Sequence, residues 1–300
     1  MAEPALVDPH AVAHVLDRLA RADAAPWLHQ EVARRMAQRL PVIRQPPQRW
    51  LDWWGFVGGG EAAVKGVLPA AQRRVVEPTR ALLHRSQQAL RRPWWALGRR
   101  GDPGSVMLEA EVPPASAQMV WANMVLHASP QPVQLLALWQ AALAVDGFLM
   151  FSTLGPDSLR ELREVYAACG WAAPHPPFTD MHDIGDQLVH GGFADPVMDQ
   201  ETLRLTWSSP QALLDELRTL GGHVGVARQT GLRTPRWRQR LLSALGERAD
   251  AQGRIGLSFE IVYGHAFKAA PRPAAGAPVT VPLEQLRASL ASRRGKPEAL

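Results

Sequence analysis

The chain has 300 residues, of which 46% are hydrophobic and 20% charged, and these values are ordinary for a globular protein of one large or two small domains. Its single cysteine, Cys169, excludes a disulfide framework and a cysteine-based metal site. The net charge of +5 is compatible with an acidic partner, such as nucleic acid, an anionic membrane or a carrier protein, and equally with a solvated basic surface.

The longest apolar stretch, residues 133–154, does not predict a membrane span. It is interrupted by Gln140, Asp146 and Gly147, so it indicates a helix, a turn and a strand. The N-terminal residues lack a basic region followed by an apolar core, which a secretory signal needs. We therefore expect a cytoplasmic protein with no membrane partner.

Helices and strands alternate along most of the chain. Residues 1–45 contain two helices with apolar residues at helical spacing, and prolines then break the chain. The predicted strands are residues 49–54, 73–78, 105–111, 117–123, 147–154, 196–207 and 254–268. The predicted helices are residues 61–68, 80–90, 132–145, 156–169, 180–191, 210–220 and 235–250.

This alternation predicts an α/β fold, a doubly wound, mostly parallel sheet of seven strands. The first five strands are expected to be parallel, and the last two to form an antiparallel hairpin at the edge. One domain then covers residues 1–268. Residues 269–300 are rich in Pro, Ala and Arg and predict a largely disordered tail.

A strand, a glycine loop, a helix, a second strand and an acid follow one another between residues 49 and 77. In an open α/β sheet, ligands lie beyond the carboxyl ends of the strands. Glycines after the first strand let the backbone approach the ligand closely. The acid that ends the next strand often holds ribose hydroxyls. Glu77 stands at that position, so the order of elements predicts a nucleotide-type site.

Three segments carry a more specific resemblance: FSTLGPDSLRELREVY at residues 151–166, DMHDIGDQLVHGGFADPVMDQETLRLTW at 180–207 and GRIGLSFEIVYGHAFK at 253–268. Together with WANMVLH at residues 121–127, they are similar to class I S-adenosylmethionine-dependent methyltransferases. The chain most resembles the malonyl-acyl-carrier-protein O-methyltransferases of biotin synthesis. The resemblance implies that S-adenosylmethionine methylates the free carboxylate of a malonyl thioester on an acidic acyl carrier protein.

The resemblance also implies a set of cofactor-binding residues, although the family's first motif, similar to L-D-x-G-x-G-x-G, is degenerate here. Trp54 and Phe56 occupy its first two glycine positions. Glu109 stands where the family usually has an Asp for the adenine end of the cofactor. Gln118 stands where an Asp is common, and a Tyr expected near residues 22–24 is missing. The residues that match cofactor-binding positions are Asp52, Gly58, Glu77, Glu109 and Asn123.

Two interpretations of this motif remain open. The glycines at 58–60 could form a shifted loop that still admits the cofactor. Alternatively, the chain is a cofactor-free scaffold or interaction module, in which tryptophans fill the vacated pocket or form a contact surface; the candidates are Trp53, Trp54, Trp94 and Trp95. Nucleic-acid binding by the arginines and tryptophans of residues 91–100 rests on charge and composition alone, and no recognisable module supports it.

The proposed methyl transfer needs no general base, because a carboxylate is already ionised at neutral pH. Arg160 or Arg163 could hold that carboxylate, although a solvated helix face explains both. An acidic carrier protein could dock on either of two arginine clusters, residues 91–100 and 233–240. His182, His190 and His265 are better explained structurally, and Asp180 as a helix cap. We assign no catalytic residue and no metal site.

Overall fold

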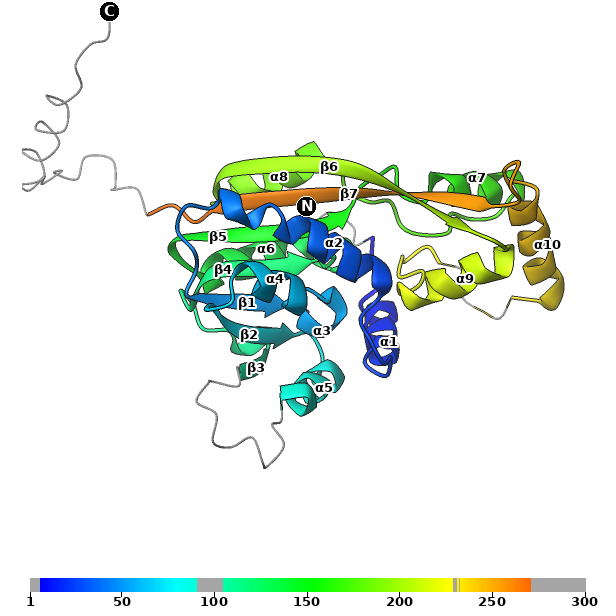
Figure 1. Ribbon diagram of the computed structural model, residues 1–300. Coiled ribbons are helices and arrows are strands. Elements are labelled where there is room, and N and C mark those ends of the chain that lie inside the picture. Colours follow the sequence, from blue (N-terminus) through cyan, green and yellow to red (C-terminus); the bar gives the residue numbers. More distant parts are fainter. Residues whose placement is uncertain (1–5, 91–104, 229–230, 232, 271–300) are drawn as a thin grey trace, which may run out of the picture. The chain divides into compact units, whose positions relative to one another are not determined.

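The computed structural model describes residues 6–90, 105–228, 231 and 233–270 (Figure 1). Up to Ala269 they belong to one compact unit. Its centre is a sheet that contains seven strands among the described residues, in the order β3-β2-β1-β4-β5-β7-β6. The strands are β1 Arg49–Trp53, β2 Gln72–Glu77, β3 Ser105–Leu108, β4 Ala117–Asn123, β5 Leu143–Leu154, β6 Ala194–Trp207 and β7 Ile255–Phe267.

The strand pairing confirms the predicted doubly wound topology. β1 pairs in parallel with β2 on one side and with β4 on the other, so the winding direction reverses between β1 and β4. β4 and β5 are also parallel. β7 is antiparallel to both β5 and β6, which gives the predicted antiparallel edge, with β7 inserted between the other two strands.

Helices cover both faces of the sheet, because its strands bury alternate residues on opposite sides. In β1, Leu51 and Trp53 enter one apolar cluster with residues of α1 and α6, whereas Trp50 enters the other with residues of α2 and α4. The helices are α1 Pro9–Leu19, α2 Trp27–Ala37, α3 Gly55–Gly58, α4 Glu61–Val67, α5 Arg80–Leu90, α6 Pro132–Ala142, α7 Arg160–Ala168, α8 Met181–His190, α9 Pro210–Thr219 and α10 Pro235–Gly246.

Some predicted boundaries differ from those of the structure. The third strand ends at Leu108, because the Glu111 carboxylate accepts the Leu108 amide N–H at 2.9 Å and a 3-10 turn begins at Glu109. The helix predicted at 156–169 begins only at Arg160, since Leu159 has a left-handed backbone with φ 56°. The predicted cap at Asp180 is confirmed by its 2.8 Å bond from the His182 amide.

None of the described helices is long and apolar enough to cross a membrane. Two predicted segments lie outside the described residues. They are the arginine-rich loop at 91–104 and all but the first two residues of the proposed tail.

Candidate functional site

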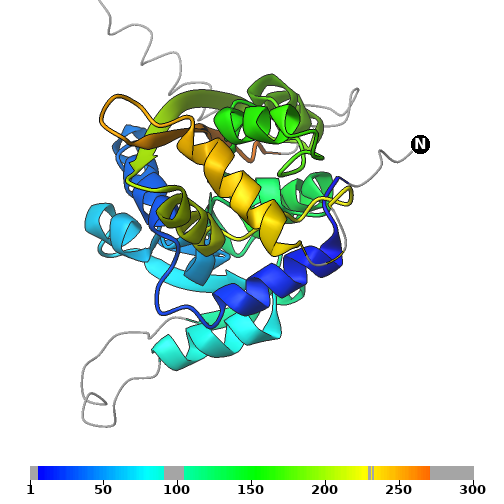
Figure 2. The same cartoon turned by 90° about the vertical axis from the view of Figure 1, so that its right-hand side faces the viewer.

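The carboxyl ends of β1 to β4 meet at the end of the sheet that α1 covers, and Figure 2 looks onto this end. Three of the predicted cofactor residues lie there. Glu77 is the last residue of β2, Glu109 follows β3, and Asn123 is the last residue of β4. The topology therefore brings together three polar side chains that are far apart in the sequence, at the place where α/β sheets bind ligands.

The loop after β1 keeps the backbone of a glycine loop although its side chains are bulky. Trp54 has φ 53° and ψ 48°, in the left-handed region that glycine favours. Its carbonyl accepts the Gly58 amide at 2.7 Å, which closes the single turn of α3. The position predicted for the family's first glycine thus has a glycine-like conformation, but it carries an indole.

Glu109 accepts hydrogen bonds from two indoles, that of Trp53 at the end of β1 and that of Trp54 in the loop. Its Oε1 accepts the Nε1–H of Trp53 at 2.7 Å and that of Trp54 at 2.8 Å. Trp54 is buried, with 4% of its surface exposed. The adenine-side acid predicted from the sequence is therefore engaged by the protein's own side chains in this conformation.

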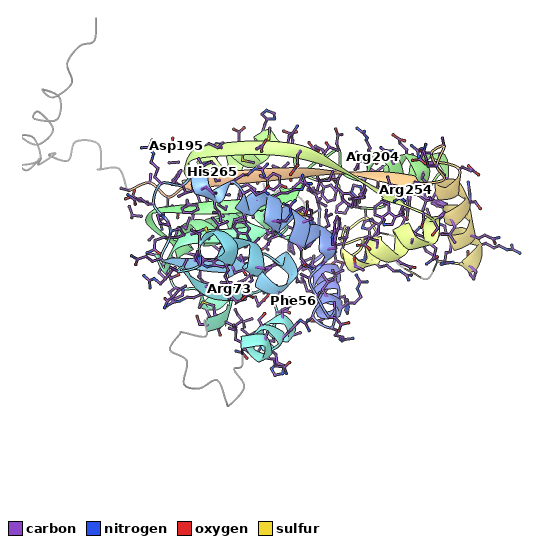
Figure 3. All side chains as sticks on the ribbon, viewed as in Figure 1. Phe56, Arg73, Asp195, Arg204, Arg254 and His265 are labelled. Carbon is purple, nitrogen blue, oxygen red and sulfur yellow. The ribbon has the colours of Figure 1, made fainter. Side chains whose placement is uncertain are left out.

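Glu77 is fully buried, and only one of its two carboxylate oxygens accepts hydrogen bonds from described residues. Its Oε1 accepts the Phe56 amide at 3.0 Å and the Ser86 hydroxyl at 2.6 Å, whereas Oε2 has no hydrogen-bond partner among the described residues. Burial raises the pKa of Glu77 to about 7. The Phe56 ring lies against α5, where the Arg85 guanidinium sits 3.9 Å from its centroid (Figure 3).

Asp52 does not lie at the open edge. It is buried in β1, and its carboxylate forms an ion pair with Arg73 of β2 at 2.6 Å. Arg73 also pairs with Glu61 at the start of α4, again at 2.6 Å. The network joins β1, β2 and the start of α4, the elements that flank the base of the loop. The structure therefore indicates that Asp52 supports the loop backbone.

Asn123 links four segments of the chain. Its Nδ2 donates to the carbonyls of His29 at 2.7 Å and Gly58 at 2.6 Å, and its Oδ1 accepts the Ser152 hydroxyl at 2.7 Å. Asn123 therefore holds the glycine loop and the start of α2 against β4 and β5.

The glycines after the loop pack against the protein and do not form a second cradle. Gly59 has φ 63°, and a Cβ there would lie 2.8 Å from the Ala25 side chain. At Gly60 a Cβ would lie 2.4 Å from the Trp121 indole nitrogen. These residues allow the loop to approach the α1–α2 connection and β4 closely, so the structure does not contain the shifted loop that the sequence left open.

A small cavity remains beside the loop. Its volume is about 40 Å³, and its lining includes Leu16 of α1, His29, Trp54, His127 and Val224. Pockets for drug-sized ligands have roughly 300–1,000 Å³. Burial lowers the pKa of His29 to about 4, and its Nδ1–H donates to the Val57 carbonyl at 2.9 Å. A neutral imidazole therefore faces the cavity at neutral pH.

We expect His29 to make the protein acid-sensitive. Because its pKa is lower in the folded than in the unfolded chain, the stability it contributes is complete above pH 6.5 and is lost as the pH falls towards 4. His29→Gln should remove about 3 kcal/mol of that loss. Urea unfolding between pH 4 and 7 measures it, with His14→Gln, an exposed helix residue, as control. Parallel pH curves for wild type and His29→Gln would contradict this assignment.

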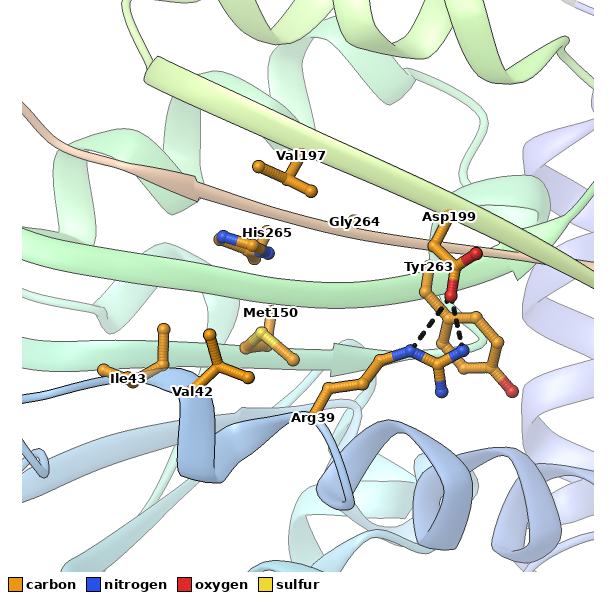
Figure 4. A pocket seen from close by; sticks show the side chains of 9 residues that line it. All are labelled: Arg39, Val42, Ile43, Met150, Val197, Asp199, Tyr263, Gly264 and His265. Atoms are coloured by element: carbon orange, nitrogen blue, oxygen red, sulfur yellow. Dashed lines mark hydrogen bonds and ion pairs between the residues drawn. The ribbon is translucent and has the colours of Figure 1, made fainter.

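A larger cavity of about 250 Å³ lies away from this edge, between the segment that follows α2 and strands β5, β6 and β7 (Figure 4). Its lining is mostly apolar. Its two charged residues pair with each other, Arg39 with Asp199 at 2.6 Å, and the guanidinium lies 3.9 Å from the Tyr263 ring centroid. The lining also includes His265, whose ring centroid lies 6.0 Å from that of Phe267. No hydrogen bond of the His265 side chain is found among the described residues, so its structural role stays a prediction.

The predicted arginine candidates among the described residues lie on or directly before α7 and α10, which contact each other. Arg160 is about half exposed, with Glu161 3.7 Å away. Arg233 stacks on Trp237 at 3.8 Å, and Arg240 lies 5.4 Å from the Trp171 ring centroid. Among the described residues, no group of three or more His, Cys, Asp or Glu side chains is placed to hold a metal ion.

Arg73, Ser86 and His29 were not singled out from the sequence. A partner for the buried Asp52 could have been sought on β2, because parallel pairing places that strand beside β1. Neither Ser86 nor His29 carries a sequence signal, since their contacts depend on how α5 and α2 pack.

Comparison with known proteins supports the resemblance, although no family model matches the chain. The chain is 38% identical over 280 residues to the malonyl-[acyl-carrier protein] O-methyltransferase of Laribacter hongkongensis, over 91% of this chain and 94% of the relative. It is 37% identical over 276 residues to the Gallionella capsiferriformans protein of the same name, over 89% and 93%.

The comparison with solved structures supports the fold. A Bacillus halodurans protein assigned as a methyltransferase superposes with a TM-score of 0.51, over 78% of this chain and 99% of that one. The two sequences are only 12% identical, so this likeness shows the fold alone.

Proposed function

Because the chain belongs to the malonyl-[acyl-carrier protein] O-methyltransferase family, we propose that it transfers a methyl group from S-adenosylmethionine to the free carboxylate of a carrier-bound malonyl thioester. The observation that carries this proposal is the buried acid Glu77 at the end of β2, within a chain that aligns with these relatives over nearly its full length. The same proposal includes that the protein acts in biotin synthesis, in the cytoplasm.

The polar residues of the edge fit this cofactor. The unpartnered Oε2 of Glu77 is a buried acceptor that a ribose hydroxyl would satisfy. Glu109 and Asn123 flank it on β3 and β4, while Asp52 and Gly58 shape the loop backbone. When bound, S-adenosylmethionine supplies an electrophilic methyl group on its sulfonium. The cavity beside the loop, in contrast, has only about 40 Å³, and the Trp54 side chain forms part of its wall.

The chain's own part in the reaction is to position the acceptor and exclude water. The acceptor carboxylate needs no base, and His29 stays neutral beside the cavity. Apolar residues of α1 and of the segment after α9, Leu16 and Val224 among them, cover the site from solvent. We propose Arg163, half-buried on α7, as the better candidate to pair with the carboxylate, since Arg160 is more exposed.

We propose that the carrier protein docks on the exposed arginines of α10, Arg236 and Arg240, which are both in the first half of that helix. Reversing their charge should raise the KM for the carrier substrate about fivefold at low salt with little change in kcat, because rim charges mainly steer association. Steady-state kinetics at two salt concentrations measure this, with Arg80→Glu on α5 as the matched control. Equal effects of the α10 and α5 variants would contradict docking on α10.

A transfer assay tests the function itself. The full chain is incubated with S-adenosylmethionine labelled in its methyl group and with malonyl, acetyl or unacylated carrier protein. Label is expected in a base-labile ester on malonyl carrier only, because acetyl carrier has no free carboxylate. Absence of transfer by a preparation that binds the donor would refute the proposed acceptor. Absence of both would favour the cofactor-free scaffold.

A further inference from the structure

The Trp54 side chain bridges two strands that are not neighbours. The sheet order places β2 between β1 and β3, and adjacent strands lie ~4.8 Å apart. Trp54 directly follows β1, yet its indole nitrogen donates to Glu109, directly after β3. The indole and the Glu109 side chain together therefore span the carboxyl end of β2, where Glu77 lies.

From this placement we propose that the Trp54 indole blocks the site in which S-adenosylmethionine, the methyl donor, would bind, and that its hydrogen bond to Glu109 holds it there. We call the indole the plug and Glu109 the latch. This inference rests on the proposed function, because it concerns the site in which S-adenosylmethionine would bind. A donor whose ribose reaches Glu77 and whose adenine extends towards Glu109 needs the same edge of the sheet as the indole. Indole and adenosyl group then exclude each other, and the donor enters only when the latch opens.

The plug is a strained arrangement maintained by its contacts. A left-handed backbone is unfavourable for a large side chain and persists where surrounding contacts fix it. Here the contacts are the bond to Glu109 and nearly complete burial of the ring. At the same time Glu77 keeps an unpaired buried oxygen. The closed state thus leaves a polar group unsatisfied that the open, donor-bound state would pair.

The cavity beside the loop agrees with this role. It is about 40 Å³, and Trp54, Val57 and His29 form part of its wall. Removing the indole would join its volume to this cavity, directly beneath α1. A glycine at position 54 would in addition keep the left-handed backbone without strain.

Calorimetric titration of the full-length chain with S-adenosylhomocysteine tests the plug without any acceptor. Trp54→Gly is expected to bind at least about tenfold more tightly than the unaltered chain, which corresponds to about 1.4 kcal/mol. Trp54→Asn, which removes the indole and keeps a residue type that tolerates the left-handed backbone, should tighten binding in the same direction by less. Trp27→Ala is the control, since that tryptophan is 51% exposed on α2 and should change nothing.

Equal affinities of the unaltered chain and Trp54→Gly would overturn the plug, as would absence of binding by a folded Trp54→Gly protein. Should Trp54→Gly fail to fold, as judged by circular dichroism and thermal melting, Trp54→Asn decides in the same way. A Trp54→Gly protein that binds the donor more tightly but methylates no malonyl carrier would leave the plug standing and refute the proposed function.

Discussion

Arg73→Gln is expected to lower the free energy of unfolding by about 3–5 kcal/mol, because it leaves the carboxylate of Asp52 buried without its cation. The two side chains are 12% and 1% exposed, so water cannot replace the lost pair. Urea unfolding at pH 7.5 measures the loss. Arg74→Gln, one residue along β2, is the matched control, since no ion pair involves Arg74 among the described residues.

Adding Asp52→Asn to Arg73→Gln should recover a large part of the stability, because the buried charge is then removed together with its partner. The destabilisation of Arg73→Gln should also shrink at acid pH, where Asp52 can take up a proton. A loss below about 1 kcal/mol at pH 7.5 would show that the network does not fix the base of the loop.

Glu77→Gln is expected to stabilise the protein above neutral pH. The pKa of Glu77 is raised to about 7 in the folded chain from an ordinary value of 4.5, so folding favours its protonated form. The stability it contributes is complete below pH 4.5 and is lost as the pH rises through 7. The amide should avoid this loss, so the variant gains about 3 kcal/mol at pH 8 and little at pH 5.

Unfolding curves at pH 5 and pH 8 measure this difference, with Glu247→Gln at the exposed residue that follows α10 as control. The same Glu77 variant should bind the donor less well, because an amide is a weaker acceptor for ribose hydroxyls than a carboxylate. Stability and ligand affinity thus move in opposite directions at pH 8. A Glu77→Gln protein that is less stable than the unaltered chain at pH 8 would contradict the assignment of a buried acid whose pKa is raised by burial.

Patterns local to a few residues predicted the fold well. The mostly apolar segment AQMVWAN predicted β4 at 117–123, and the observed strand has the same limits. A strand that ends in an acid likewise placed Glu77 at the carboxyl edge. Local changes of backbone conformation were harder to predict. The residues around Leu159 carry no pattern that indicates its left-handed conformation, and α7 therefore begins later than predicted, at Arg160.

Contacts across the sheet could not be read from the sequence. The bond from Trp54 to Glu109 joins residues 55 positions apart and depends on the order of β1, β2 and β3. The sequence showed that an indole replaces a glycine, but it did not show where the ring goes. Only the structure shows that the loop keeps a glycine-like backbone and that the indole is hydrogen-bonded to Glu109 after β3.

A crystal structure of the full chain with S-adenosylhomocysteine would test the central claim most directly, that a donor site lies at this edge and Trp54 closes it. We predict the ribose on Glu77, the adenine beside the end of β3, and the Trp54 indole withdrawn from Glu109. A ligand-free edge at saturating ligand, with Trp54 still bonded to Glu109, would contradict the account. So would a ligand bound elsewhere, for example in the cavity beside Tyr263.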